Sequence, residues 1–418
     1  MRLLFVHQHL GAFGGAEANI LLTTAELKRR GHAVALLHSD TTGKGEATWR
    51  DTFSETFQLP SQVRDSDISN VLGEFDPDLI YYHNLDDLEP METLLGSGVP
   101  VVRMVHDHSM YCLRGYKYNY FTRAACQRPA SFRCVFPCLA TLARNRGGGF
   151  PIKWASYGAK RKEIQLNRRC EEFVVYSEYS KAELVRNNFP AEKIHIHVPV
   201  RCWGTDGPTS SFSERNLILY VGQIIRGKGV DLLLEALAHV EASFECVIVG
   251  DGNHRAYCER LAAKLGLSDR VEFRGFIPSD DLKDLYLETS VFVVPSVWPE
   301  PFGLVGPEAM RYGLPVVAFD VGGISEWLTD RENGRLVPSM DTRRFAISID
   351  ELLSDKQLAR ETGLRGMERV NEIYDCARQV DNLESLFERV LNKANRNAPP
   401  TVPDGFAYAL TGATVSDL

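Results

Sequence analysis

Two glutamates, Glu300 and Glu308, lie eight positions apart in the stretch PEPFGLVGPE at 299–308. An apolar run at 291–294 precedes it, and the pattern predicts a buried strand, a loop, and a short helix with Pro307 at its first position. Such a loop presents free backbone N–H groups and the positive end of a helix dipole, which favour an anion. The carboxylates would repel an anion and suit hydroxyl groups instead. The stretch therefore predicts a ligand with phosphates and hydroxyls, such as a nucleotide sugar, and a purely structural loop is an equally good interpretation on local grounds.

A second candidate loop is GQIIRGKG at 222–229, directly after a predicted strand at 217–221. Its glycines allow the backbone to approach a ligand closely. Arg226 and Lys228 bring two positive charges that can bind a diphosphate, and arginine can bind it through two parallel hydrogen bonds. A solvated basic turn is the alternative. The position after a strand end, like that of the Glu300 loop, favours binding.

Two weaker signals lie in the first half of the chain. Gly14 and Gly15 come between a predicted strand at 3–7 and a predicted helix, where they can direct N–H groups at phosphate or sugar oxygens. The dinucleotide fingerprint G-x-G-x-x-G is absent there and at the second loop. His106 ends a predicted strand at 101–105 and can bind a sugar hydroxyl. An ordinary tight turn and a structurally satisfied histidine are the alternatives.

Four cysteines, Cys112, Cys126, Cys134 and Cys138, follow the spacing C-x13-C-x7-C-x3-C. Four thiolates can form a closed structural zinc site, and the last spacing is permissible for one. The other two spacings are not those of a standard zinc finger. Scattered reduced thiols or a disulfide are therefore the alternatives to zinc.

The cysteines lie in a strongly basic segment, residues 109–169, with 13 basic residues and one acid, Glu163. The net charge of the chain is −8, so this segment carries about +12 and the remainder about −20. Segregation of charge on this scale indicates an anionic partner. Aromatic residues such as Tyr111, Tyr118 and Phe121 interleave with the basic ones, and they suit a membrane interface or sugar stacking at least as well as nucleic acid.

Length and composition set the frame for these sites. The 418 residues, 44% of them hydrophobic, are enough for two ordinary domains. No apolar run reaches the roughly 18 residues of a membrane-spanning helix, and the first residues are too short an apolar stretch for a signal peptide. Nine cysteines without an export signal indicate a reducing cytoplasm.

Strand and helix patterns alternate along the chain, which predicts an α/β protein with two Rossmann-like, doubly wound parallel-sheet domains that face a cleft. The expected division is a first domain at 1–200, a linker at 201–214, a second domain at 215–374, a final helix at 375–394 and a tail at 395–418. The predicted strands are residues 3–7, 33–37, 79–82, 101–105, 173–176, 193–198, 217–221, 246–249, 271–273, 291–294 and 316–319. The predicted helices include 16–30, 230–240, 254–265, 280–288 and 340–353.

In this order, the motifs resemble those of glycosyltransferase family 4, the large family of retaining nucleotide-sugar glycosyltransferases with the GT-B fold. The resemblance runs from residue 3 to about residue 391, and the ordered set is far more specific than any single motif. It rests on GGAE at 14–17, HD at 106–107, the 222–228 loop, VGDG at 249–252, FRGF at 273–276 and the 300–308 motif. The long basic, cysteine-rich segment departs from the usual pattern.

The resemblance implies a role for each motif in donor binding. Glu308 would bind the ribose hydroxyls, Glu300 would contact the transferred sugar, and His106 would contact the same sugar from the first domain. Arg226 and Lys228 would neutralise the departing diphosphate. The remaining donor-binding residues, which would act mainly through their backbones, are Gly14, Gly15, Gly222, Gly275, Phe276, Phe302, Gly303, Leu304 and Val305.

The resemblance also implies an enzyme that moves a hexose-type sugar to an acceptor hydroxyl with retention, in polysaccharide, glycolipid or other glycoconjugate synthesis. Cationic residues would replace a metal cofactor, and the donor would be a UDP- or GDP-sugar. We expect an anionic or lipid-linked acceptor and contact with the cytoplasmic face of the membrane. We do not expect a nucleic-acid partner. The first domain would carry the acceptor side, and the final helix would cross back onto it. A phosphorylase or sugar-phosphate synthase of the same fold, and a non-catalytic binding protein, are the alternatives.

Overall fold

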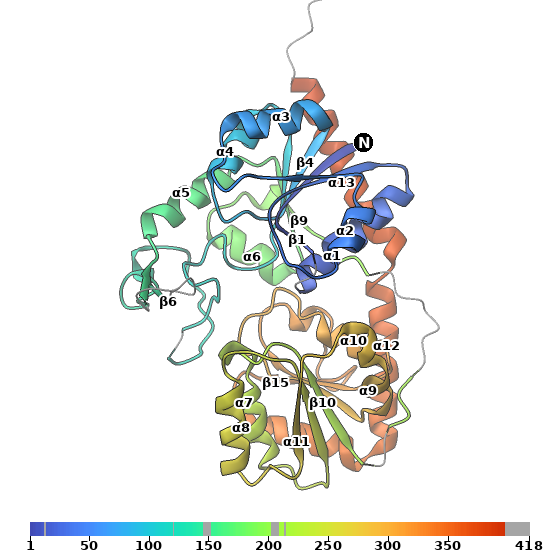
Figure 1. The fold of residues 1–418 in the computed structure, drawn as a ribbon. Coiled ribbons are helices and arrows are strands. Elements are labelled where there is room, and N and C mark those ends of the chain that lie inside the picture. Colours follow the sequence, from blue (N-terminus) through green and yellow to red (C-terminus); the bar gives the residue numbers. More distant parts are fainter. Residues whose placement is uncertain (12–13, 120, 145–151, 202–208, 213–214, 398–418) are drawn as a thin grey trace, which may run out of the picture.

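The structure is a computed structural model that describes residues 1–11, 14–119, 121–144, 152–201, 209–212 and 215–397. Two α/β units lie one beyond the other, each built on its own parallel sheet, and helix α13 runs back along the first unit (Figure 1). The sheets have seven and six strands, so the predicted fold class, two doubly wound parallel-sheet units, is confirmed.

The first sheet has the strand order β3-β2-β1-β4-β5-β8-β9, and all of its neighbouring strands are parallel. Its central strands are buried along nearly their whole length because helices cover both faces, which is why they appear in the sequence as continuous apolar runs. The strands are β1 (Arg2–Leu10), β2 (Ala33–Thr41), β3 (Glu55–Gln58), β4 (Leu79–Tyr82), β5 (Val101–Met104), β8 (Glu172–Val175) and β9 (Ile194–Ile196). The helices are α1 (Gly15–Arg29), α2 (Glu46–Thr52), α3 (Asp65–Phe75), α4 (Glu89–Gly96), α5 (Tyr157–Asn167) and α6 (Glu178–Arg186).

The second sheet has the order β12-β11-β10-β13-β14-β15 and is also parallel. Its strands are β10 (Leu217–Val221), β11 (Glu245–Val249), β12 (Val271–Gly275), β13 (Val291–Val294), β14 (Val316–Asp320) and β15 (Arg335–Pro338). Its helices are α7 (Val230–Leu237), α8 (Arg255–Lys264), α9 (Lys283–Glu288), α10 (Val305–Met310), α11 (Thr342–Ser354) and α12 (Lys356–Ile373). A short 3-10 helix, η3 (Arg226–Lys228), precedes α7.

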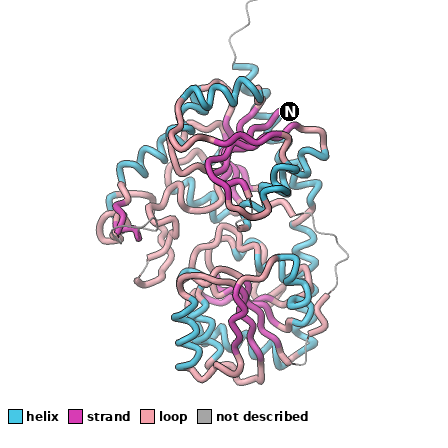
Figure 2. The backbone as a smooth tube through the Cα atoms, in the orientation of Figure 1, coloured by secondary structure: helices cyan, strands magenta, loops and turns pink. Residues whose placement is uncertain are grey.

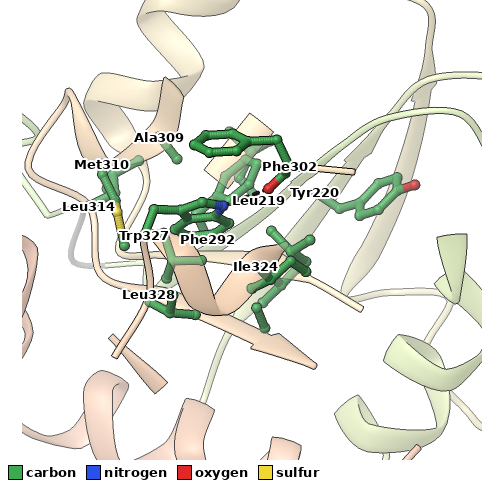
Figure 3. Packing of buried hydrophobic residues seen from close by; sticks show 14 of the residues in the cluster. Leu219, Tyr220, Phe292, Phe302, Ala309, Met310, Leu314, Ile324, Trp327 and Leu328 are labelled. Carbon is green, nitrogen blue, oxygen red and sulfur yellow. Dashed lines mark hydrogen bonds between the residues drawn. The ribbon is translucent and has the colours of Figure 1, made fainter. Parts of the chain in front are cut away.

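A buried tryptophan fixes the loop between β13 and α10. Trp327 is 1% exposed and lies among Phe292, Phe302 and Leu328, as Figure 3 shows. Its indole N–H donates to the carbonyl of Phe302 at 2.7 Å. A Cβ on Gly306 would lie 2.1 Å from the Trp327 ring, so only glycine fits there. The core of the second unit thus holds the loop that carries Glu300 and the start of α10, which carries Glu308.

Most predicted elements are present, with shifted ends. Strands β4, β10 and β13 match their predicted ranges, whereas the edge strands β3 and β15 were not predicted. The prediction for Pro307 was wrong, since α10 starts at Val305 and the proline is its third residue. Its missing N–H still costs no helical hydrogen bond there, because the first four N–H groups of a helix have no partner within it.

The last helix, α13 (Cys376–Asn397), joins the second unit to the first. Arg30, at the end of α1, donates to the carboxylates of Asp381 and Glu384 on α13. The rings of Tyr81 and Phe387 pack edge to face with centroids 5.1 Å apart. Within the described residues, no helix is both long and apolar enough to cross a membrane.

The basic segment leaves the first unit after β5 and projects beside it, around the short antiparallel pair β6 (Leu142–Arg144) and β7 (Ile152–Trp154) (Figure 1). Figure 2 shows that this projection is mostly loop. Part of it hangs toward the second unit (Figure 1), where Arg123 of the segment pairs with Asp231.

Candidate active site

The carboxyl ends of the two sheets meet across a narrow contact. His108, after β5, donates from its ring Nε2 to the carbonyl of Pro299 at 2.7 Å. Ser177, after β8, donates to the carbonyl of Pro301 at 2.6 Å. In parallel sheets the loops after the strand ends form the ligand-binding edge. The ligand-binding edge of the first unit therefore contacts the loop that carries Glu300, which lies on the same edge of the second unit.

Glu300 and Lys228 form the central pair of the site. The Lys228 ammonium lies 2.6 Å from Oε1 of Glu300, and Ser296 donates to the same oxygen at 2.6 Å. The Glu300 side chain is 8% exposed, and the lysine also lies 4.9 Å from the centre of the Trp298 ring. A cation, an aromatic face and a hydrogen-bonded carboxylate thus converge at the ends of β10 and β13.

Three glycine loops at the ends of β10, β11 and β12 close the other side of this edge. Gly222 has φ +157, and Gly250 and Gly275 have φ +132 and +75. A Cβ on Gly250 would lie 1.8 Å from the carbonyl oxygen of Gly222, so the backbones touch directly. Phe276, the next residue after Gly275, is 74% exposed, with the Lys44 ammonium of the first unit 5.7 Å from its ring centre. The Phe276 ring is therefore accessible, and it lies beside backbone segments that pack directly against one another.

The segment from Phe302 to Glu308 turns into α10. Phe302 is buried, Gly303 has φ +83, and Leu304 is the N-cap of α10. A Cβ on Gly15 would lie 3.3 Å from the Leu304 side chain, so the two predicted donor-binding loops of the two units contact each other.

Glu308 keeps 32% of its side-chain surface accessible, and Nε of Arg201 lies 3.9 Å from its carboxylate. Loss of solvent around the carboxylate raises the pKa of Glu308, and the Arg201 charge partly offsets this effect. The group protonates at a higher pH than an ordinary glutamate.

His106 lies in a chain of rings on the first unit. Its Nε2 is 2.8 Å from Nδ1 of His83, and its Nδ1 is 2.7 Å from the hydroxyl of Tyr176. Burial, together with the nearby His7 and Arg103, lowers the pKa of His106 to about 3, so the imidazole is neutral. Both ring nitrogens are engaged within the protein. A hydrogen bond from His106 to a ligand therefore has to replace one of these two.

Gly14 caps α1 in an extended conformation, and its carbonyl accepts from Ala18 N at 3.1 Å. Residues 12 and 13 of the same loop lie outside the described residues. In the first turn, Glu17 lies 3.3 Å from His7. Burial alone would raise the pKa of the Glu17 carboxyl. The hydrogen bond and the charge of His7 outweigh this effect, so the pKa is lowered. The acid of the GGAE motif is thus held inside the unit.

The four cysteines Cys112, Cys126, Cys134 and Cys138 line one cavity of about 270 Å³ in the basic segment, and all are free thiols. Burial raises the pKa of Cys134 and of Cys138. Among the described residues, no group of three or more histidine, cysteine or acidic side chains is arranged to hold a metal ion. The zinc prediction is not supported. Cys376, on α13, is disulfide-bonded, although the sequence led us to expect thiols in a reducing compartment.

Several residues of the site were not predicted. Ser296 precedes Glu300 by four positions, and its place in the loop after a strand was a signal that could have revealed it. Arg201 and Tyr176 gave no such signal, because their partners Glu308 and His106 lie far away in sequence.

Two facing parallel α/β units with glycine loops and an acidic motif between them form the GT-B fold of glycosyltransferases. Residues 13–197 match the family model "Glycosyltransferase Family 4", and residues 206–369 match "Glycosyl transferases group 1". The chain belongs to this glycosyltransferase family.

Among curated relatives, an uncharacterized glycosyltransferase of Methanocaldococcus jannaschii is 39% identical over 144 residues, which are 34% of this chain and 37% of that protein. The α-D-kanosaminyltransferase of Streptomyces kanamyceticus is 27% identical over 253 residues, covering 57% and 64%. The chain thus spans less than two thirds of the length of these relatives. Among solved structures, Anabaena HepE in complex with UDP and glucose has a TM-score of 0.71 at 19% identity, covering 93% of this chain and all of that one. This likeness shows the shared fold.

Proposed function

We propose that the protein is a retaining glycosyltransferase that moves a sugar from a nucleoside diphosphate to an acceptor hydroxyl. The observation that carries this proposal is the convergence of Lys228, Glu300 and Ser296 at the strand ends of the second unit, within 2.6 Å contacts. A lysine next to a carboxylate supplies one group for a phosphate and one for sugar hydroxyls. The match of the first unit to the family 4 model and of the second unit to the group 1 model supports the same assignment.

The donor is proposed to lie along the second sheet's carboxyl edge. Its base would rest against the backbone around Gly275 and the exposed Phe276 ring, and Glu308 would accept from the ribose hydroxyls. The ribose contact suits Glu308, whose carboxylate is partly accessible beside Arg201. The N–H groups of Gly303 to Val305, at the start of α10, would face the sugar and its phosphate.

The proposed reaction breaks the bond between the sugar's anomeric carbon and the diphosphate oxygen. Negative charge grows on the diphosphate as this bond breaks, and the cations of Arg226 and Lys228 stabilise it where it forms. The acceptor oxygen attacks the same face of the sugar, and its proton passes to the leaving phosphate oxygen. Glu300 would hold the sugar, and His106 would contact it by exchanging its hydrogen bond to His83 for one to a hydroxyl.

Donor binding is tested by thermal shift against UDP-, GDP- and dTDP-sugars, because a ligand that binds only the folded protein raises its apparent stability. The expected result is a shift with UDP- or GDP-sugars. A product assay then separates the alternatives. Release of nucleoside diphosphate supports transfer from a nucleotide sugar, whereas release of sugar 1-phosphate indicates a phosphorylase. No shift with any donor and no product would refute the assignment.

We also propose a membrane-facing acceptor side. Phe132 and Phe136 are 71% and 70% exposed on the projecting basic segment, with Leu139 and the exposed Arg133 close in sequence. Aromatic rings and arginines together suit the interface of an anionic bilayer. We therefore propose that the protein works at the cytoplasmic face of the membrane on a lipid-linked or otherwise anionic acceptor.

Flotation with anionic liposomes tests the membrane proposal. We expect association at low salt that weakens as salt rises, and weaker association of the Phe132→Ser/Phe136→Ser variant. Neutral liposomes serve as the control. Absence of wild-type association at low salt would remove the membrane contact and leave a soluble acceptor.

The domain division into 1–200, 201–214, 215–374, 375–394 and 395–418 remains a proposal. It is supported by the change of sheet between β9 and β10 and by the contacts of α13 with the first unit. Limited proteolysis near the linker would test it, with two stable fragments as the expected result.

A further inference from the structure

A hairpin in the basic segment crosses from the first unit to the second. We define this "Arg123 hairpin" as residues 117–119 and 121–126. Its backbone is closed by Cys126 N donating to Lys117 O at 2.7 Å and by Asn119 N donating to Ala124 O at 2.9 Å. At its base, the Lys117 ammonium lies 2.9 Å from the carboxylate of Glu183 on α6, and both side chains are at most 3% exposed. A buried ion pair therefore anchors the hairpin on the first unit.

The tip of the hairpin is held by the second unit. The guanidinium of Arg123 donates through two nitrogens to the two carboxylate oxygens of Asp231, with 10% and 6% of the side chains exposed. A bidentate ion pair between arginine and a carboxylate that is largely shielded from solvent is among the stronger polar contacts in proteins. Arg123 also has φ +59, a conformation that costs energy for a residue with a side chain. The ion pair with Asp231 and the turn of the hairpin hold the Arg123 backbone in this conformation.

Asp231 connects this contact to the phosphate-binding turn. It lies in the first turn of α7, two residues after Gly229, which ends the η3 turn formed by Arg226 to Lys228. The hairpin thus contacts the second unit next to the η3 turn, which carries the two cations that we assign to the diphosphate.

Tyr118 of the hairpin packs on the same turn. A Cβ on Gly227 would lie 3.2 Å from Cε1 and from the hydroxyl of Tyr118. On its other side, the Gly227 carbonyl accepts from the N–H groups of Val297 and Trp298, both at 2.9 Å. The peptide between Arg226 and Lys228 is therefore held between the Glu300 loop and a side chain from the opposite unit.

We propose that Arg123 and Tyr118 are positioning residues for the phosphate-binding turn: the hairpin holds Arg226 and Lys228 in their binding conformation, and nucleoside diphosphate binding and hairpin docking reinforce each other. The coupling is reciprocal, because two events that favour one arrangement of the turn favour each other equally. The proposal rests on the proposed function for the ligand, whereas the coupling of hairpin and turn can be tested without any ligand.

Hydrogen exchange of the unliganded protein tests the coupling. The reporters are the amides of Lys228 and Leu233, which donate to Ile225 O and Gly229 O at 2.9 Å. In the Arg123→Ala variant we expect about tenfold faster exchange of these amides, because local opening no longer has to break the hairpin contact. Tyr118→Ala, which leaves the ion pair in place, should act in the same direction.

The matched control is Arg161→Ala, an exposed arginine on α5 of the same segment, which should leave the exchange unchanged. A general loss of structure would speed exchange throughout the second sheet, whereas positioning predicts a change confined to the η3 turn and the start of α7. Unchanged protection in both the Arg123 and the Tyr118 variant would overturn the proposal.

Calorimetric titration with UDP and with GDP tests the ligand part. Arg123→Ala should bind the diphosphate about tenfold more weakly, and Arg161→Ala should match the wild type. In a double-mutant cycle with Asp231→Asn, the two losses should be strongly non-additive. Additive losses would overturn the pairing. If the wild type binds neither nucleotide, the proposed function fails, and hydrogen exchange still decides whether the hairpin positions the turn.

Discussion

Replacing Lys228 by methionine should separate the stability of the site from its chemistry. The substitution leaves the Glu300 carboxylate, 8% exposed, with the Ser296 hydroxyl as its remaining polar contact among those described above. Removing one partner of a fully buried ion pair costs about 3–5 kcal/mol. Lys228 is 21% exposed, so water can partly replace it, and we expect a loss of about 2 kcal/mol.

A loss of that size lowers the apparent melting temperature by about 4–8 °C for a unit of this size. Turnover should fall at least ~100-fold, the scale of losing one preorganised charge contact in a transition state. The measurements are thermal denaturation and release of nucleoside diphosphate from the donor found by thermal shift. Lys264→Met, at an exposed position of α8, is the control for a change of lysine to methionine.

The double variant Lys228→Met/Glu300→Gln makes the reasoning refutable. A neutral amide needs no counter-charge, so most of the lost stability should return, while turnover stays at least ~100-fold down. If the single variant melts like the wild type, the ion pair contributes nothing measurable. If either variant turns over at a near-native rate, the lysine does not stabilise the leaving group.

Three further predictions follow from single contacts. Donor affinity should fall as the pH is lowered through the raised pKa of Glu308, because a protonated carboxyl accepts hydrogen bonds from the ribose hydroxyls less well. Glu308→Gln should bind the donor more weakly, and its affinity should no longer fall at low pH, as measured by titration at several pH values. Arg30→Ala should cost about 1–3 kcal/mol in urea denaturation by loosening α13, with the exposed neighbour Arg29→Ala unchanged. Gly306→Ala should cost at least ~2 kcal/mol, since the new methyl group meets the Trp327 ring; native stability would show that the ring can move.

Local patterns were sufficient for three short strands in the middle of the sheets, whereas β1 and β2 run three and four residues beyond their predicted ends. The runs that became β4, β10 and β13 are continuous and apolar because both of their faces are covered, so their ends are visible in the sequence. Of the four edge strands, β9 and β12 were predicted and β3 and β15 were missed; β3 has no fully buried residue, because a strand at the edge of a sheet can bury less. Pro307 shows the same limit at a helix start, since several positions there tolerate proline equally well.

The roles within the site divide in the same way. That Glu300, Lys228 and Glu308 follow strand ends could be read from the chain, because parallel strands bring their carboxyl ends to one edge. That Lys228 lies against Glu300, that both nitrogens of His106 are occupied, and that four cysteines share a cavity without forming a metal site are matters of side-chain geometry.

The two parallel α/β units and the charged loops at their strand ends could be predicted from the amino-acid pattern alone, since hydrophobic period, glycine positions and charge are local properties of the chain. The contact of the basic segment with the second unit, by contrast, is visible only in the folded molecule. Arg123 and Asp231 are 108 positions apart and lie in different units, and neither pattern points to the other. Contacts of that kind depend on how two separately folded surfaces meet, and this depends on the packing of the whole molecule rather than on any segment of it.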